Sequence, residues 1–142
     1  MNSFKVVIIG NGEYLDPDEY LKDDQQVGLV QRVADIAPFY NDCLLNIVTL
    51  QSATSILLKI TKAMSFGCPL ISTTLGAEGF VYDENYIVIA DTPEQFADGI
   101  ILLLNNAALR KKLSKCGRLL VEQKYDWKIL LNEFKEVIHS LK

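Results

Sequence analysis

Residues 59–73, KITKAMSFGCPLIST, contain most of a helix, its end and a following strand. Ala63 and Met64 follow Ile60 at spacings of three and four residues, which is the pattern of an amphipathic helix. Gly67 predicts the end of this helix, because glycine readily adopts the left-handed conformation that follows a helix. The apolar segment PLIST, residues 69–73, then predicts a buried strand.

The residues before this stretch complete a strand–helix–strand unit. LLNIVTL, residues 44–50, is a continuous apolar run, which indicates a strand buried on both faces of a parallel sheet. The loop QSATS, residues 51–55, leads into the helix, which we expect from about Ser55 to Phe66. Two strands of one sheet that are joined by such a helix are parallel. The unit therefore predicts an α/β fold.

The same alternation extends in both directions from this unit. Further predicted elements are strands at 4–9, 27–30 and 86–90, a helix at 35–43, and helices at 92–105, 107–123 and 127–141. Thr92 before Pro93, and Asp126 before Trp127, are typical residues for helix starts. The prediction is a Rossmann-like open parallel sheet of about five strands with flanking helices, followed by C-terminal helices over residues 92–141.

Composition excludes several classes of protein. The chain has 142 residues, of which 49% are hydrophobic, and this suits one folded domain. Its net charge of −4 argues against a general nucleic-acid-binding protein, which carries a basic patch. No apolar run reaches the roughly 18 residues that indicate a membrane-spanning helix. The three cysteines, Cys43, Cys68 and Cys116, form no CxxC pair and are expected to be free thiols in a cytoplasmic protein.

A ligand site is expected at one edge of the predicted sheet. Open α/β sheets bind ligands beyond the carboxyl ends of their strands. In this chain the loops that follow predicted strands or border them are residues 10–13, 31–35, 49–55 and 73–79. The GNG at residues 10–12 does not continue as a GxGxxG fingerprint, which argues against a dinucleotide-dependent dehydrogenase.

Seven segments, in their order along the chain, resemble one enzyme family. They are the strand before GNG, VGLV, DIAPFY, KITKAMSFGCPLIST, GAEG, ADTPEQFA and EQKYDW. Together they look like the C-terminal half of GT-B glycosyltransferases of the retaining family 4 type, in group 1. The resemblance covers the chain from about Phe4 to Leu141 and implies half of a GT-B fold.

The resemblance implies a single donor-binding domain over residues 1–142. In that family the domain binds a nucleotide diphosphate sugar, the donor substrate, and no metal or other cofactor is expected. The family's enzymes are glycosyltransferases of the hexosyltransferase type, and polysaccharide biosynthesis is the expected process. Their N-terminal acceptor domain and the first strand–helix unit of the donor domain have no counterpart in these residues. The isolated chain is therefore expected to transfer no sugar, and its implied partners are the donor and the missing domain.

The implied donor site lies at the start of the helix near Ser55. Free backbone N–H groups and the positive end of the helix dipole suit a diphosphate there. The residues expected to bind the nucleotide sugar are Gly12, Thr54, Ser55, Ile56, Lys59, Lys62 and Glu78, and no catalytic residue is assigned.

Two of these positions depart from the family pattern. The family carries acids at positions 62 and 54, where this chain has Lys62 and Thr54, whereas the flanking Ala63 and Met64 match. A lysine offers three donors and no acceptor, so it favours an anion over the hydroxyl donors of a ribose. Two alternatives stay open: Lys62 is a solvated residue if the helix is rotated, and Glu78 is a solvated turn residue.

A second interpretation is a catalytically inactive GT-B-like domain that is retained for binding or assembly. The chain is also expected to self-associate through an unpaired sheet edge, through the last helix, or through both. The last helix, residues 127–141, carries more apolar surface than one stripe. A cytoplasmic location, or a peripheral one at the membrane as part of a longer enzyme, fits the resemblance.

Overall fold

The computed structural model describes residues 4–10, 26–49, 56–80 and 83–141. These residues belong to two compact units, Met1–Pro38 and Phe39–Lys142, each with a parallel sheet of its own. The predicted α/β class and the parallel direction of the strands are confirmed.

The first unit contains a two-stranded sheet. β1 (Val6–Gly10) pairs in parallel with β2 (Val27–Gln31), and the register begins with Val6 opposite Val27. Both strands fall on the apolar runs from which they were predicted. The side chains of both strands are exposed or half-buried, and none is fully buried.

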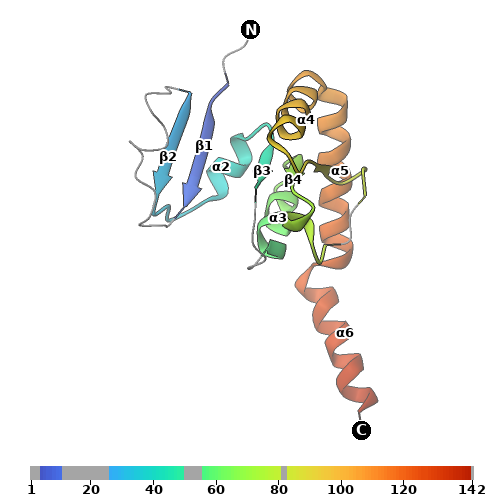
Figure 1. Ribbon diagram of the computed structural model, residues 1–142. Coiled ribbons are helices and arrows are strands. Elements are labelled where there is room, and N and C mark those ends of the chain that lie inside the picture. Colours follow the sequence, from blue (N-terminus) through green and yellow to red (C-terminus); the bar gives the residue numbers. More distant parts are fainter. Residues whose placement is uncertain (1–3, 11–25, 50–55, 81–82, 142) are drawn as a thin grey trace. The chain divides into compact units, whose positions relative to one another are not determined.

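The second unit contains a three-stranded parallel sheet. β3 (Asn46–Val48), β4 (Leu70–Ser72) and β5 (Val88–Ile89) pair in this order, so that β4 is the central strand. Figure 1 shows β3 beside β4. The helix α3 (Ile56–Ser65) connects β3 with β4 and runs back along the sheet between these parallel strands. The strand–helix–strand unit predicted around residues 59–73 is therefore confirmed.

The remaining α-helices also follow the predicted order, and a short 3-10 helix, η1 (Leu75–Ala77), lies in the loop that was expected at residues 73–79. The α-helices are α2 (Ala37–Asp42), α4 (Pro93–Asn105), α5 (Ala107–Lys124) and α6 (Trp127–Ser140). Thr92 caps α4 as predicted: Thr92 Oγ1 accepts from Gln95 N, and Gln95 Oε1 accepts from Thr92 N, both at 3.3 Å. Asp126 caps α6 by accepting from Lys128 N at 2.8 Å.

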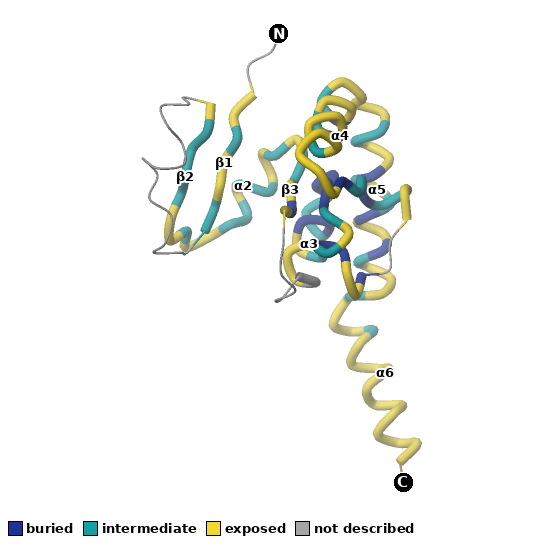
Figure 2. Tube along the Cα trace, viewed as in Figure 1, coloured by how far each residue is buried: buried dark blue, intermediate teal, exposed yellow. Residues whose placement is uncertain are grey.

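All three side chains of the central strand β4 are buried. Because successive side chains of a strand point to opposite sides, β4 is buried on both faces. Leu70 lies in the α3-side core, which contains Val48, Ile60, Ala63, Met64, Cys68, Leu70, Ala77, Phe80, Ile87 and Leu120. Ile71 lies in the α4-side core, which contains Ile71, Ala90, Leu103 and Leu113. Figure 2 shows the buried segments gathered around α3 and α5.

The helix α5 contributes to both cores and to the ends of two other helices. Its Leu120 lies in the α3-side core and its Leu113 in the α4-side core. Arg110 Nη1 donates to the carbonyl oxygens of Leu103 and Leu104, at 2.5 and 2.8 Å, and so satisfies the end of α4.

Two features differ from the sequence-based prediction. Hydrogen bonds join the described strands as a pair and a trio rather than as one sheet, because β1 pairs with β2 inside the first unit. The strand predicted at 86–90 is shortened to Val88–Ile89, because a turn occupies its first residues. Tyr86 N and Ile87 N both donate to Asp83 O, so these groups are not free for the ladder.

The last helix, α6, buries none of its side chains. Figure 2 shows it as exposed along nearly its whole length. Its exposed large apolar side chains, with the residue that follows the helix, are Trp127, Leu130, Leu131, Phe134, Val137, Ile138 and Leu141. No helix within the described ranges is both long enough and apolar enough to cross a membrane.

Candidate functional site

The carboxyl ends of β4 and β5 lie next to each other, because the two strands are adjacent and parallel. β4 continues into Thr73, Thr74 and η1, and β5 continues into Asp91. Since α3 runs against the direction of the strands, its amino-terminal end lies at this same edge, and α3 contacts η1. The loop predicted at residues 73–79 thus occupies the edge at which open α/β sheets bind ligands.

Two hydrogen bonds join the loop after β4 to the residue after β5. Thr74 N donates to Asp91 Oδ1 at 2.7 Å, and Thr74 Oγ1 donates to Asp91 Oδ2 at 2.7 Å. These donors stabilise the ionised carboxylate and hold the pKa of Asp91 below its ordinary value, against a smaller opposing effect of desolvation. Gln95 Oε1 accepts from Asp91 N at 2.8 Å, so the start of α4 is part of the same set of contacts.

The turn after Thr74 is held closely against the end of β4. Gly76 N donates to Thr73 Oγ1 at 2.8 Å, and Ser72 Oγ donates to Thr73 O at 3.0 Å. Gly76 is buried, and a Cβ atom there would overlap Ser72 Oγ and lie 2.8 Å from Thr73 Oγ1. Ala77 is buried in the α3-side core. The turn is therefore firmly held and fixes the place at which the chain reaches Glu78.

A hollow of about 570 Å³ lies beside this turn and is lined by Thr74, Leu75, Glu78 and Asp91. Both carboxylate oxygens of Asp91 are engaged by Thr74. Glu78 is exposed, and its carboxylate has no hydrogen bond or ion pair with any other residue in the described ranges. Of the two acids at the hollow, Glu78 is therefore the one whose whole carboxylate is available to accept hydrogen bonds from the hydroxyl groups of a bound molecule, while Asp91 keeps only part of its acceptor capacity.

Both lysines predicted for the site are exposed on α3. The buried face of this helix consists of Ile60, Ala63 and Met64. At the helical spacing, Lys62 lies nearly opposite this face and Lys59 lies on its flank. Neither ammonium group has a hydrogen bond or ion pair with a residue in the described part of the chain. The alternative that Lys62 is simply solvated therefore stays open.

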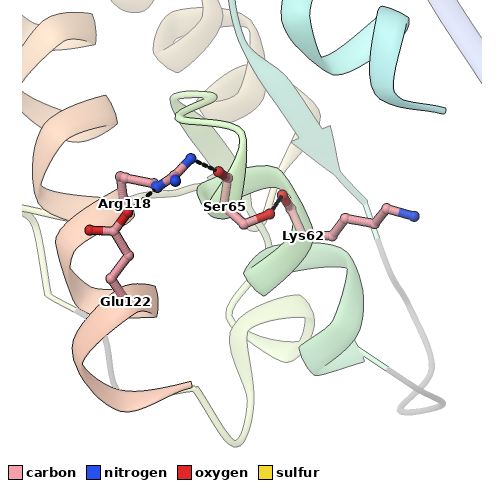
Figure 3. Close-up of polar contacts among 4 residues, drawn as sticks. All are labelled: Lys62, Ser65, Arg118 and Glu122. Carbon is pink, nitrogen blue, oxygen red and sulfur yellow. Dashed lines mark hydrogen bonds and ion pairs between the residues drawn. The ribbon is translucent and has the colours of Figure 1, made fainter. Parts of the chain in front are cut away.

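The backbone near Lys62 is fixed by contacts that do not involve its ammonium group. Arg118 of α5 donates to the Ser65 carbonyl, and Arg118 Nε donates to Glu122 Oε1 at 2.5 Å. Ser65 Oγ in turn donates to the Lys62 carbonyl at 2.7 Å. Figure 3 shows the Lys62 side chain extending away from Arg118 and α5. The end of α3 is thus held through its backbone carbonyl groups, and the Lys62 ammonium group is available to interact with solvent or with a ligand.

Comparison with known families identifies the family of this chain. A sequence profile described as "Glycosyl transferases group 1" matches residues 1–106. The chain belongs to this family. No curated protein sequence matches this group 1 glycosyltransferase chain significantly.

Solved structures support the same fold. The C-terminal domain of a glycosyl transferase group 1 family protein (LpcC) from Francisella tularensis is 26% identical, with a TM-score of 0.63 over 78% of this chain and 59% of that one. A glycosyltransferase from Rickettsia africae is 17% identical, with a TM-score of 0.77 over 94% and 39% of the two chains. Sucrose-phosphate synthase from Thermosynechococcus elongatus is 20% identical, with a TM-score of 0.75 over 96% and 38%.

These likenesses confirm the predicted fold, an α/β domain like the C-terminal domain of GT-B glycosyltransferases. The second and third structures, at their lower identities, support the fold alone. The group 1 chain spans between 38% and 59% of the length of these three structures.

The described part of this glycosyltransferase chain contains some of the predicted donor-binding residues. Gly12, Thr54 and Ser55 lie outside the described residues, as does the side chain of Ile56, whose backbone opens α3. The predicted caps of α3, Thr54 or Ser55, therefore stay predictions. Ile56 and Glu78 lie at the same edge of the sheet, because α3 begins at the edge where the parallel strands β3 and β4 both end.

Neither Asp91 nor Thr74 was among the residues predicted for the site of the group 1 chain. Asp91 precedes the predicted helix start at Thr92, and Thr74 lies in the loop of residues 73–79 that was expected at the ligand edge. A usable signal was the position of both residues directly after two apolar strands that were expected to be parallel. Within the described ranges, no group of three His, Cys, Asp or Glu side chains could hold a metal ion, and the expected independence of a metal stays a prediction.

Proposed function

We propose that the chain is the donor-binding part of a two-domain glycosyltransferase, which transfers a sugar from a nucleotide diphosphate sugar to an acceptor. The observation that carries this proposal is Glu78, an exposed acid without a described partner, which a firmly held turn presents at the carboxyl edge of the sheet. In a group 1 glycosyltransferase chain, such a carboxylate can accept hydrogen bonds from the hydroxyl groups of the ribose or the donor sugar.

The amino-terminal end of α3 would hold the diphosphate. Free backbone N–H groups and the positive end of the helix dipole favour an anion at that position. Lys59 stands one turn into α3 and adds positive charge. When the bond to the sugar breaks, negative charge develops on the leaving diphosphate, and fixed positive groups lower the energy of that transition state. Gly12, Thr54, Ser55 and Ile56 complete the proposed set.

The acceptor would be bound by a second, N-terminal domain. The much greater length of the similar solved structures supports a longer enzyme, because this chain covers only 38–59% of them. The complete enzyme would be a metal-independent hexosyltransferase of polysaccharide biosynthesis, in the cytoplasm or on the membrane surface. This chain alone would bind the donor but transfer no sugar.

One observation favours a second candidate, an inactive domain retained for binding or assembly. Lys62 stands where the resembling family has an acid, and it is exposed on α3. A lysine cannot accept hydrogen bonds from ribose hydroxyls. If the family's acid at position 62 is essential for binding the donor, then this chain has lost nucleotide binding and kept the fold.

Nucleotide binding to the isolated chain tests the proposal. UDP, GDP and ADP are each titrated while the melting temperature is followed by fluorescence. One of them should raise the melting temperature saturably, because a ligand present at a hundred times its Kd stabilises the folded state by about 2.7 kcal/mol. No rise with any of the three would favour the inactive domain.

Two controls separate a donor site from a general anion site. Pyrophosphate alone should raise the melting temperature less than the preferred nucleotide does. Glu78→Gln should weaken binding of the nucleotide sugar, whereas Glu136→Gln on α6 makes the same charge change far along the sequence and should have no effect. Equal effects of the two substitutions on binding would contradict the proposed role of Glu78 in the site.

A further inference from the structure

Cys43 and Cys68 come from different segments of the second unit and meet in space. Cys43 follows the end of α2, and Cys68 lies between the end of α3 and the start of β4. They are 25 residues apart in the sequence, yet their Sγ atoms are 2.8 Å apart. Both are free thiols, since a disulfide bond is about 2.05 Å long. No sequence spacing predicted this contact.

The packing around the pair holds both sulfur atoms in place. The Tyr40 carbonyl oxygen lies 3.1 Å from Cys68 Sγ and 3.4 Å from Cys43 Sγ, and each thiol can donate its one proton either to this oxygen or to the other sulfur. The Tyr40 ring stacks on Phe66 with ring centroids 5.1 Å apart. Cys68 is 4% exposed within the α3-side core, and Cys43 packs against that core while half-buried. The two thiols therefore share one acceptor and have little room to separate.

The two thiols differ in exposure and in acidity. The hydrogen bond from Cys68 stabilises a thiolate on Cys43 and lowers the pKa of Cys43, although burial opposes this effect. The same hydrogen bond, together with burial, raises the pKa of Cys68. Cys43 is thus suited to attack an oxidant from the half-exposed side, and Cys68 is suited to react second from the buried side.

We propose that Cys43 and Cys68 are a redox pair that closes to a reversible disulfide when the protein meets a hydroperoxide. The site is independent of the proposed donor site. It would be a modification site of the chain, and it would tie the end of α2 to the turn between α3 and β4.

The reaction balances with hydrogen peroxide as the oxidant. The Cys43 thiolate attacks one peroxide oxygen, an S–O bond forms as the O–O bond breaks, and the departing oxygen takes a proton to leave as water. The Cys68 sulfur then gives up its proton and attacks the sulfur of the Cys43 sulfenic acid. The S–S bond forms as the S–O bond breaks, and a second water leaves. The two thiols lose two electrons and two protons, which the peroxide gains.

The proposal is tested on the whole chain by intact mass and by thiol counting. The protein is treated with one equivalent of hydrogen peroxide, then alkylated with iodoacetamide under denaturing conditions. Of the three cysteines, we expect Cys116 alone to be alkylated. Before alkylation, the mass of the oxidised protein should be lower than that of the reduced protein by two hydrogen atoms. Peptide mapping should find a Cys43–Cys68 link, and dithiothreitol should restore all three thiols.

Matched single substitutions identify the pair. Cys116→Ser changes a half-buried cysteine on α5 and should leave formation of the disulfide unchanged. Cys43→Ser should abolish it, and thermal unfolding shows whether that variant is folded. If Cys43→Ser is unfolded, peptide mapping of the Cys116→Ser variant decides alone. The proposal is overturned by a link that includes Cys116, by oxidation of Cys43 to a sulfinic acid without a link, or by no reaction of the pair.

Discussion

Lys62 is the residue at which the two proposed functions separate. Its ammonium group is exposed and has no partner within the described ranges, so a substitution there changes little in the fold. If Lys62 faces the ribose, Lys62→Glu supplies an acceptor pair and should tighten binding of the nucleotide sugar about tenfold, because hydrogen bonds to charged groups contribute about 1.5–3 kcal/mol. Isothermal titration measures the change.

The matched control for this prediction is Lys111→Glu, which makes the same charge change at an exposed position on α5. It should leave affinity unchanged. If Lys62→Glu behaves like the control, then Lys62 is a solvated residue and the comparison of position 62 with the family's acid is wrong.

Asp91 gives the folded state a dependence on pH. Its pKa is lowered in the folded chain by the two donors of Thr74. A lowered pKa contributes stability that is fully present above the unfolded value, near pH 4, and is lost as the pH falls through the folded value. Chemical denaturation from pH 6 downward should show this loss in the natural sequence and a smaller loss in Asp91→Asn.

A control acid within α4, the helix that follows Asp91, separates this local effect from general acid unfolding. Asp98→Asn removes an exposed carboxylate of α4 that lies outside the Thr74 contacts. Its stability should fall with pH as it does in the natural sequence. Identical curves for Asp91→Asn and the natural sequence would show that the Thr74 contacts do not stabilise the fold.

Gly76 is a residue whose size the fold dictates. A Cβ atom there would overlap Ser72 Oγ, and the Ser72 side chain is fully buried with its hydroxyl bonded to Thr73 O. Gly76→Ala should therefore lower the free energy of unfolding by about 1–3 kcal/mol, the usual range for overpacking. Gly10→Ala, where a Cβ meets no described residue within 4 Å, is the matched control and should be close to neutral in urea denaturation.

At the scale of the elements, the start of α4 is stabilised by hydrogen bonds between residues that are close in the sequence. Thr92 and Gln95 satisfy each other's backbone N–H groups in a capping box. Thr92→Ala should lower the free energy of unfolding by about 1 kcal/mol, whereas Thr92→Ser retains the hydroxyl and should cost less than half of that. Thermal unfolding of the two variants checks the difference. Equal losses would mean that the methyl group, and not the hydroxyl, stabilises this end.

The elements show which features a sequence can predict. Helix starts at Thr92 and Asp126 were predictable, because the capping groups lie within three residues of the N–H groups that they bind. The end of β4 was not, because Thr74 is engaged by Asp91, 17 residues later. The contact of Cys43 with Cys68 was hidden for the same reason. The candidate site was predictable as a loop after a strand, while its internal contacts were not.

At the scale of the whole molecule, the exposed apolar side chains of α6 predict self-association of the isolated chain. Phe134 lies on the apolar face of α6 and is 62% exposed. Light scattering over a concentration series should show an apparent mass above the 15.9 kDa of one chain. Phe134→Glu should return the chain toward a monomer, because it places a charge in the apolar contact.

Lys128→Glu, on the same helix, changes the charge without removing an apolar side chain and should leave association unchanged. A monomer at all concentrations in the natural sequence would contradict the prediction. Within the described ranges, the order and direction of the strands and α-helices were predictable, because each of them has its own apolar pattern. The division into two units was not, because it depends on which strand pairs with which.

The position of α5 has a consequence for the order in which the protein can become folded during its synthesis. The family match ends at residue 106, before α5 begins. A nascent chain emerges from the ribosome amino-terminus first, so residues up to 106 appear before Leu113 and Leu120 can fill the two cores. Arg118, which donates a hydrogen bond to the Ser65 carbonyl, is likewise synthesised 53 residues after Ser65. The residues that the family profile matches are therefore synthesised before α5, and their two cores can be completed only after α5 has been made.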